Sequence, residues 1–294
     1  MRLAYTTVTD TFFFDLDIAN LAEFVDEIKE TMVFSSAPKQ GDGCYGIARF
    51  KNTYVLGKRI ANKNAEARSS LLVYDLAWNF LKEIPVKGCK QLHQITPWQD
   101  KMLCASTGTN EIFVTDMNTG KSTSSHLSIN KPIAETKTDE NHINSMCIHG
   151  DSIYLYCHNH CNSMIVDVEL SSVLSADKMR INRTYEYVGM QGHNVMILGN
   201  RLLSLNSEHG MLMCHGLKTG CELQTVALDG RYLRGLEATS NHIFIGGSYV
   251  AKDRTERFAN KDIVIYVLEK TSLEIVSRIG LAGKKNILDI RVTK

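Results

Sequence analysis

The chain has 294 residues, of which 44% are apolar and 22% are charged, a balance typical of globular proteins rather than disordered or fibrous ones. Its 33 basic and 32 acidic side chains leave a formal net charge of +1, so no strong field is available to gather nucleic acid or an anionic membrane. No apolar run approaches the length of a signal peptide or a membrane span. We therefore expect a cytoplasmic protein with no nucleic-acid or membrane partner.

Eight cysteines in a chain of this length are too few for a disulfide scaffold. Cys104 and Cys147 lie inside apolar, strand-like runs, where a free thiol packs like a small apolar side chain. We expect reduced thiols.

Near the amino terminus, residues 17–29 are the only segment with a helical pattern. An amphipathic helix there would carry its apolar side chains on one side, namely Ile18, Leu21, Phe24, Val25 and Ile28. That side would either bind a partner or pack against the last of the repeat units described next.

From residue 41 onward one hairpin pattern recurs: an apolar run, a two-residue polar turn and a second apolar run. The second turn residue is always Asn or Asp, which tolerate the positive φ of tight hairpin turns. The turns are Lys51-Asn52, Gln99-Asp100, Gly150-Asp151, Gly199-Asn200 and Ser240-Asn241.

A polar loop and further strand-like runs follow each hairpin, so each unit has four strands and about fifty residues, the size of a propeller blade. We predict an all-β, six-bladed β-propeller forming one domain, with five blades at about 41–88, 89–138, 139–187, 188–229 and 230–282. The sixth would join residues 283–294, as the inner strand, to strands from residues 1–40, which removes exposed edges. A five-bladed ring with loose ends is the alternative.

The start of each inner strand lies at a fixed distance before its turn. In a propeller these positions meet at one end of the central channel, so polar side chains from distant parts of the chain would converge there. They are Tyr45, His93, Asn144, His193, Arg234 and, by alignment of ILDI with GLEA, Asn286.

Convergent imidazoles and amides can hold a metal or a small ligand, and Zn, Fe, Mn or Ni suits them better than Ca. Polar residues can also line a channel only because the channel is wet. The expected metal ligands are His93, Asn144 and His193, with His158 and His160 as further candidates.

The loops after the second strands open on the same face and carry further reactive side chains. Glu208 and His209 could act as general acid or base, and Arg234 and Arg254 could hold an anionic group. The run from Cys157 to Cys161 contains His158 and His160, but it lacks the paired spacing of a zinc site, and strand alternation would separate its ligands.

No phosphate-binding loop, dinucleotide glycine motif, HExxH or nucleophile elbow is present, so we expect no nucleotide cofactor.

The segments LHQITPWQDKMLCASTGTNEIFVTD, NHINSMCIHGDSIYLY, GHNVMILGNRLLSLNS and LRGLEATSNHIFIGGS resemble a bacterial propeller family of uncharacterised function. That family is similar to the six-bladed group of gluconolactonases, strictosidine-synthase-like proteins and NHL-repeat proteins. The resemblance covers about residues 41–294 and implies the fold rather than an activity. The resemblance to gluconolactonase-like enzymes implies a divalent metal on the channel axis, held by a Glu, an Asn and an Asp. Of these three ligand positions, only the Asn is matched in this sequence, by Asn144.

Two functions follow as hypotheses. The first is a metabolic or biosynthetic enzyme of hydrolase, lyase or isomerase type acting on a small polar or anionic substrate. His93 and His193 would be metal ligands or acid and base, Asn144 would orient the substrate and Arg234 would neutralise its anion. The second is a non-catalytic propeller whose face binds a peptide, a glycan or a partner protein.

Overall fold

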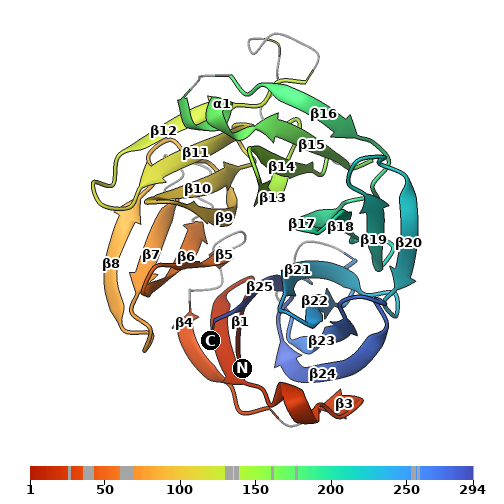
Figure 1. The fold of residues 1–294 in the computed structure, drawn as a ribbon. Helices are drawn as coiled ribbons and strands as arrows, with labels where there is room; N and C mark the ends of the chain where they lie inside the picture. The colour runs from red at the N-terminus through yellow and green to blue at the C-terminus, as the bar shows by residue number, and fades with distance from the viewer. Residues whose placement is uncertain are drawn as a thin grey trace.

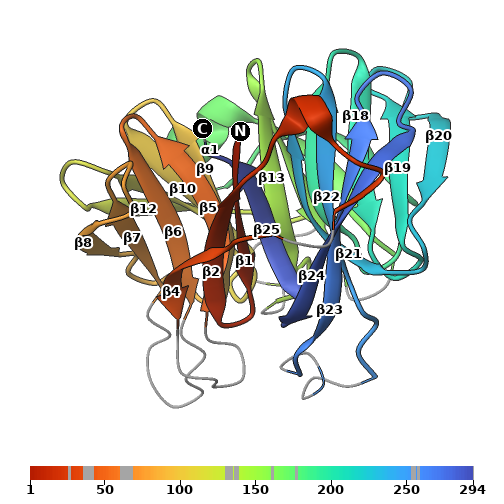
Figure 2. The same cartoon turned by 90° about the horizontal axis from the view of Figure 1, so that it is seen from below.

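Six β-sheets stand in a ring around a central axis in the computed structural model of the chain (Figure 1). The structure describes residues 1–25, 28–35, 43–59, 69–129, 135, 139–159, 162–175, 178–252, 256 and 259–293. Seen from the side, the strands run along the ring axis (Figure 2). The fold is a six-bladed β-propeller, as predicted.

The first three blades each hold four antiparallel strands, ordered below from the axis outward. Blade 1 has β5 (Gly43–Phe50), β6 (Thr53–Arg59), β7 (Ser70–Tyr74) and β8 (Phe80–Pro85). Blade 2 has β9 (Leu92–Trp98), β10 (Lys101–Ser106), β11 (Glu111–Asp116) and β12 (Ser122–His126). Blade 3 has β13 (Ile143–His149), β14 (Ser152–Cys157), β15 (Met164–Glu169), the helix α1 (Leu170–Ser175) and β16 (Ile181–Tyr185).

The other three blades repeat this arrangement, with one added strand. Blade 4 has β17 (His193–Leu198), β18 (Arg201–Asn206), β19 (Met211–Gly216) and β20 (Glu222–Ala227). Blade 5 has β21 (Tyr232–Ala238), β22 (His242–Ser248), β23 (Lys261–Glu269), β24 (Ile275–Lys284) and β3 (Phe24–Val25). Blade 6 has β25 (Ile287–Val292), β1 (Arg2–Thr7), β2 (Asp10–Asp15) and β4 (Thr31–Ser35).

The ring closes by pairing the two ends of the chain. Strand β25 is the inner strand of blade 6 and pairs antiparallel with β1, with Leu3 opposite Val292 and Tyr5 opposite Ile290. The labels N and C lie side by side in Figure 1. This closure is the predicted one, and it excludes the five-bladed alternative because the terminal strands complete a sixth sheet.

The predicted helix over residues 17–29 is wrong. Asp17 caps the 3-10 turn η1 (Ile18–Asn20), which ends after three residues. Strand β3 then pairs in parallel with β24, and the Arg278 amide donates to the Glu23 carbonyl at 2.9 Å. A short isolated helix is only marginally stable, whereas a sheet edge offers hydrogen-bond partners to the backbone N–H and C=O groups of this segment.

The apolar side chains of this segment nevertheless pack against the last two blades. Four of the five are partly buried against the cluster shared by blades 5 and 6: Ile18, Leu21, Val25 and Ile28. Phe24 is half exposed.

The hairpin turns differ from expectation in one detail. In four of the five turns positive φ occurs at the first turn residue, Lys51 (52°), Gln99 (53°), Gly150 (58°) or Gly199 (59°), and not at the Asn or Asp that follows. In the fifth turn neither Ser240 nor Asn241 has positive φ. A turn in which only the first central residue has positive φ is type II′-like, and it twists as well as type I′ with the flanking strands. The Asn/Asp pattern therefore predicted the positions of the turns correctly, but the positive φ that it was expected to explain does not lie at the Asn or Asp.

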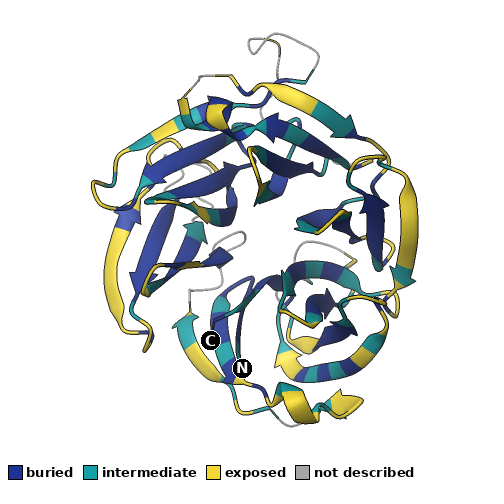
Figure 3. Ribbon diagram, in the orientation of Figure 1, coloured by how far each residue is buried: buried dark blue, intermediate teal, exposed yellow. Residues whose placement is uncertain are grey.

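The core is divided among the interfaces between blades. Six apolar clusters of described residues each join two neighbouring sheets, so every blade is buried on both faces. Figure 3 shows this burial, with exposed residues concentrated on the outer strands and loops. No helix in the described part of the chain is long and apolar enough to cross a membrane. All seven cysteines that the structure describes are free thiols.

Candidate functional site

In every blade, pairing between the innermost strand and its neighbour is irregular near the start of the innermost strand. The register shifts at Tyr45 in β5, Asn144 in β13, Asn194 in β17 and Gly235 in β21, and equivalent shifts affect β9 and β25. A β-bulge breaks the in–out alternation of a strand and redirects side chains. Two consecutive residues of one strand can therefore both face the axis.

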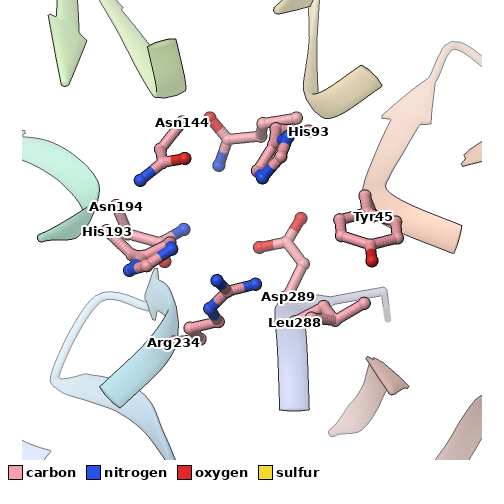
Figure 4. A pocket seen from close by; sticks show the side chains of 9 residues that line it. Tyr45, His93, Asn144, His193, Asn194, Arg234, Leu288 and Asp289 are labelled. Carbon is pink, nitrogen blue, oxygen red and sulfur yellow. The ribbon is translucent and has the colours of Figure 1, made fainter. Parts of the chain in front are cut away.

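Figure 4 shows the cavity that these bulges enclose. Its lining comes from all six blades and includes three consecutive pairs: Tyr45, His93, Gln94, Asn144, His193, Asn194, Arg234, Leu288 and Asp289. The volume open to the centre of a water molecule is about 10 Å³. That space suits about one water, or one group of similar size at the tip of a larger ligand.

The structure brings together five of the six residues that the sequence placed on the axis: Tyr45, His93, Asn144, His193 and Arg234. Asn286 is buried but does not line the cavity, since blade 6 contributes Leu288 and Asp289 instead.

Sequence reasoning missed Gln94, Asn194 and Asp289. For Gln94 and Asn194 the available signal was a polar residue directly after an expected ring position, which regular alternation would have sent away from the axis. Asp289 lies three residues after Asn286, so it had no such signal.

The three missed residues link neighbouring blades. Each accepts a hydrogen bond from a backbone N–H of the next inner strand. The bonds are Met146 N to Gln94 Oε1 (2.7 Å), Gly235 N to Asn194 Oδ1 (2.9 Å) and Ile47 N to Asp289 Oδ2 (3.0 Å). They hold the inner strands in a fixed ring and so position the axial side chains.

An arc of six rings, each contacting the next, includes three side chains that line this cavity, namely Tyr45, His93 and His193. The centroid distances are 5.3 Å for Tyr45–His93, 5.1 Å for His93–His142, 4.9 Å for His142–His158, 5.7 Å for His158–His193 and 5.7 Å for His193–Tyr232. We call these six residues the ring arc. It spans blades 1 to 5 and leaves open the side that belongs to blade 6.

A guanidinium stacks on the tyrosine at each end of the ring arc. Arg59 lies 4.8 Å from the centroid of Tyr45, and Arg234 lies 5.7 Å from that of Tyr232. Because blade 6 lies between blades 5 and 1, the two arginines flank the open side of the arc. The site therefore carries positive charge at both ends.

The hydrogen bonds of the two axial histidines define their tautomers. The Ser207 hydroxyl donates to the Leu233 carbonyl at 2.7 Å, so it accepts from His193 Nδ1 at 2.9 Å. His93 Nδ1 lies 3.2 Å from the Gln91 carbonyl, which can only accept. Both imidazoles thus carry the proton on Nδ1 when neutral, and each Nε2 keeps a lone pair.

Burial lowers the pKa of both His93 and His193 well below the ordinary 6.5. Neighbouring imidazoles and the Arg234 guanidinium lower the pKa of each further. Both axial histidines are therefore neutral at physiological pH.

The loop candidates do not line the cavity. Glu208 and His209 are exposed, although the Glu208 amide donates to the Met190 carbonyl at 3.3 Å, close to the start of β17. His158 belongs to the ring arc. His160, Cys161 and Arg254 lie outside the described residues.

The axial metal stays a prediction, and the candidate ligand His160 lies outside the described residues. In the part of the chain that the structure describes, no group of three or more His, Cys, Asp or Glu side chains could hold a metal ion. The described imidazoles form a curved row of ring contacts rather than a cluster around one point. The arrangement suits contact with an extended ligand, and we derive no chemistry through a metal.

No protein-family model matches the chain, and no curated protein matches it. Solved structures, in contrast, match the chain in fold. A chain in the nidogen/laminin complex is similar over 100% of this chain and 98% of that chain, with a TM-score of 0.68 and 7% identity. A protein of unknown function from Bacteroides caccae is similar over 99% and 97%, with a TM-score of 0.67 and 9% identity. A chain of the mitotic checkpoint complex is similar over 99% and 80%, with a TM-score of 0.58 and 9% identity.

Likeness at these identities establishes the fold alone. The chain is thus a six-bladed β-propeller with a polar site on its axis. None of these three structures bears the name of the gluconolactonase or NHL-repeat group, so that resemblance stays a prediction.

Proposed function

We propose that this propeller is a non-catalytic recognition module that binds an acidic segment of a partner protein on its axial face. The observation that carries the proposal is the ring arc with a guanidinium stacked at each end. Tyrosine and arginine are the residue types most enriched at the centres of protein interfaces. Arg59 and Arg234 can each hold a carboxylate through two parallel hydrogen bonds.

The charge of the site supports an anionic partner. The Arg59 guanidinium forms no ion pair with any carboxylate in the described part of the chain. Between the two cations, His93 and His193 are neutral and each keeps an acceptor Nε2. The donors for a carboxylate are therefore the two guanidiniums, one at each end of the ring arc.

Two of the similar propellers come from protein complexes, nidogen with laminin and the mitotic checkpoint complex. Each of those two structures is, by its name, an assembly of several proteins. They support a protein partner for this chain as well, because it shares the fold of chains found in those assemblies.

The test compares two fluorescein-labelled, amino-terminally acetylated Gly-Ser peptides, one with three central Glu residues and one with three Gln. Fluorescence polarisation should show the Glu peptide binding at least about tenfold more tightly, with the difference shrinking as salt rises. Arg234→Gln and Arg59→Gln should each weaken that binding about tenfold. The matched control is Arg180→Gln, because Arg180 pairs with Glu169 on the exterior of blade 3 with its side chain 68% exposed. Equal binding of both peptides, or no effect of either axial substitution, contradicts the proposal.

A second candidate is an enzyme acting on a small polar substrate, and one observation favours it. The hydrogen bond from His193 Nδ1 to Ser207 fixes the tautomer of this neutral imidazole, whose buried Nε2 lone pair has no hydrogen-bond partner among the described residues. Such a group can accept a proton from a substrate. Turnover of a small anionic ester or lactone that is lost in His193→Gln would favour this enzyme over the recognition module.

A further inference from the structure

Three side chains on the axis carry buried acceptor atoms that have no hydrogen-bond partner among the residues that the structure describes. They are Asn144 Oδ1, His193 Nε2 and Asp289 Oδ1, on residues that are 4%, 4% and 1% exposed. All three residues line the same cavity and come from blades 3, 4 and 6. A buried acceptor without a partner is destabilising, so three of them in one cavity indicate a ligand that donates hydrogen bonds.

The other polar atoms of these side chains are engaged, which holds each free acceptor in place. Asn144 Nδ2 donates to the Gly192 carbonyl at 2.8 Å, and Asp289 Oδ2 accepts from Ile47 N at 3.0 Å. His193 Nδ1 bonds to Ser207. None of the three can turn its free acceptor elsewhere without breaking one of these bonds.

Three free acceptor atoms favour a ligand group that can donate three hydrogen bonds. A hydroxyl donates one hydrogen bond and a water donates two, whereas a primary ammonium donates three. An ammonium group is about the size of a water molecule, which is the size of the cavity. The Asp289 carboxylate provides a negative charge beside it.

The surrounding charge restricts the ligand further. Arg234 lines the cavity and Arg59 stacks on the lining residue Tyr45. Arg291 Nη2 also lies 3.8 Å from Asp289 Oδ2, so a ligand that carries only an ammonium meets three nearby cations and one carboxylate. A ligand with an anionic group next to the ammonium places the anion at the guanidiniums and the cation at the three acceptors.

We propose that the axial cavity binds the primary ammonium of a ligand that also presents a carboxylate to Arg59 and Arg234. This deepens the proposed function and rests on its anion site. The chemistry is that of a free α-amino acid, or of a partner's amino-terminal residue with an acidic side chain. Capture of a chain end by a preformed set of polar groups is an established mode of peptide recognition.

The experiment uses three probes that differ at one position: acetate, glycolate and glycine. Binding is followed by NMR through the imidazole Cε1–H signals of the full-length protein. We expect the dissociation constant to fall in the order acetate, glycolate, glycine, with at least about a tenfold difference between the first and the last. Glycine and an aspartyl-glycinamide with a free or an acetylated amino terminus distinguish the two sources. A free amino acid site favours glycine, and a chain-end site favours the unblocked aspartyl peptide.

Variants test the acceptor atoms themselves. Asp289→Asn keeps an oxygen for Ile47 N and removes the carboxylate, and it should reduce the advantage of glycine over acetate to less than about threefold. Asp229→Asn is the matched control, because Asp229 is an exposed partner of Arg278, outside the cavity. It should leave the probe order unchanged.

Equal binding of glycine and acetate overturns the ammonium site and leaves the proposal of acidic-segment binding standing. Absence of binding by all three probes also overturns the ammonium site, and the acetylated peptides then decide the anion proposal separately. An unchanged glycine preference in Asp289→Asn overturns the assignment as well.

Discussion

The closure of the ring depends on one arginine near the end of the chain. Arg291 lies in β25, and its Nε donates to the Ile47 carbonyl of blade 1 at 2.9 Å. Its Nη1 bonds to Glu237 Oε2 of blade 5 at 3.2 Å, and its Nη2 lies 3.8 Å from Asp289 Oδ2. One side chain therefore connects the last strand to both neighbouring blades.

Arg291→Met keeps much of the apolar stem but leaves Glu237 and Asp289 without their cation. Removing one partner of a buried ion pair costs about 3–5 kcal/mol. The Arg291 side chain is 20% exposed, so we take the lower end, about 3 kcal/mol. At about 2–4 °C per kcal/mol, the melting temperature should fall by about 6–12 °C.

Urea unfolding followed by circular dichroism measures this loss, with Arg180→Met as the control. Arg180 bonds to Glu169 at 2.7 Å, but the pair is exposed and should contribute less than about 1 kcal/mol. In Arg291→Met, the second change Glu237→Gln should recover part of the loss by removing the unpaired charge. Equal losses in Arg291→Met and Arg180→Met would refute the reasoning.

Three further predictions concern stability and reactivity. Burial depresses the pKa of His93 and His193 below 6.5, so below that pH the unfolded chain binds protons that the native state does not. The unfolding free energy should therefore be fully developed above about pH 6.5 and fall toward pH 5, and His93→Gln with His193→Gln should flatten that slope in urea titrations. Iodoacetamide at about pH 7.5, read by mass spectrometry, should modify exposed Cys221 well before Cys44, because burial raises the pKa of the Cys44 thiol to about 12. Gly46→Ala places a methyl 2.8 Å from a backbone nitrogen of blade 2, and thermal melts should show a loss of about 1–3 kcal/mol; an unchanged melt would contradict that packing.

Much of the architecture follows from local patterns in the sequence. The hairpin turns, such as Lys51-Asn52 and Gln99-Asp100, depend on a few neighbouring residues, so they can be recognised without knowing the fold. Their repeat predicted the blades, and the incomplete units at the two ends predicted closure. Counting from those turns also placed Tyr45, His93 and Asn144 on the axis.

Long-range contacts decided what the local patterns left open. Residues 17–29 have an apolar pattern that suits a helix, but the free edge of β24 offered a better partner for their backbone. Asp289 faces the axis, rather than Asn286, because a bulge at the start of β25 changes the strand's alternation.

The repeat in the sequence by itself determined that inner-strand starts from distant blades would meet, because a closed ring of sheets has only one axis. Only the tertiary structure decided which side chains face that axis and which of their atoms stay without partners. Bulges and inter-blade hydrogen bonds depend on contacts between segments far apart in the chain. The periodicity of the sequence within one segment therefore cannot predict them.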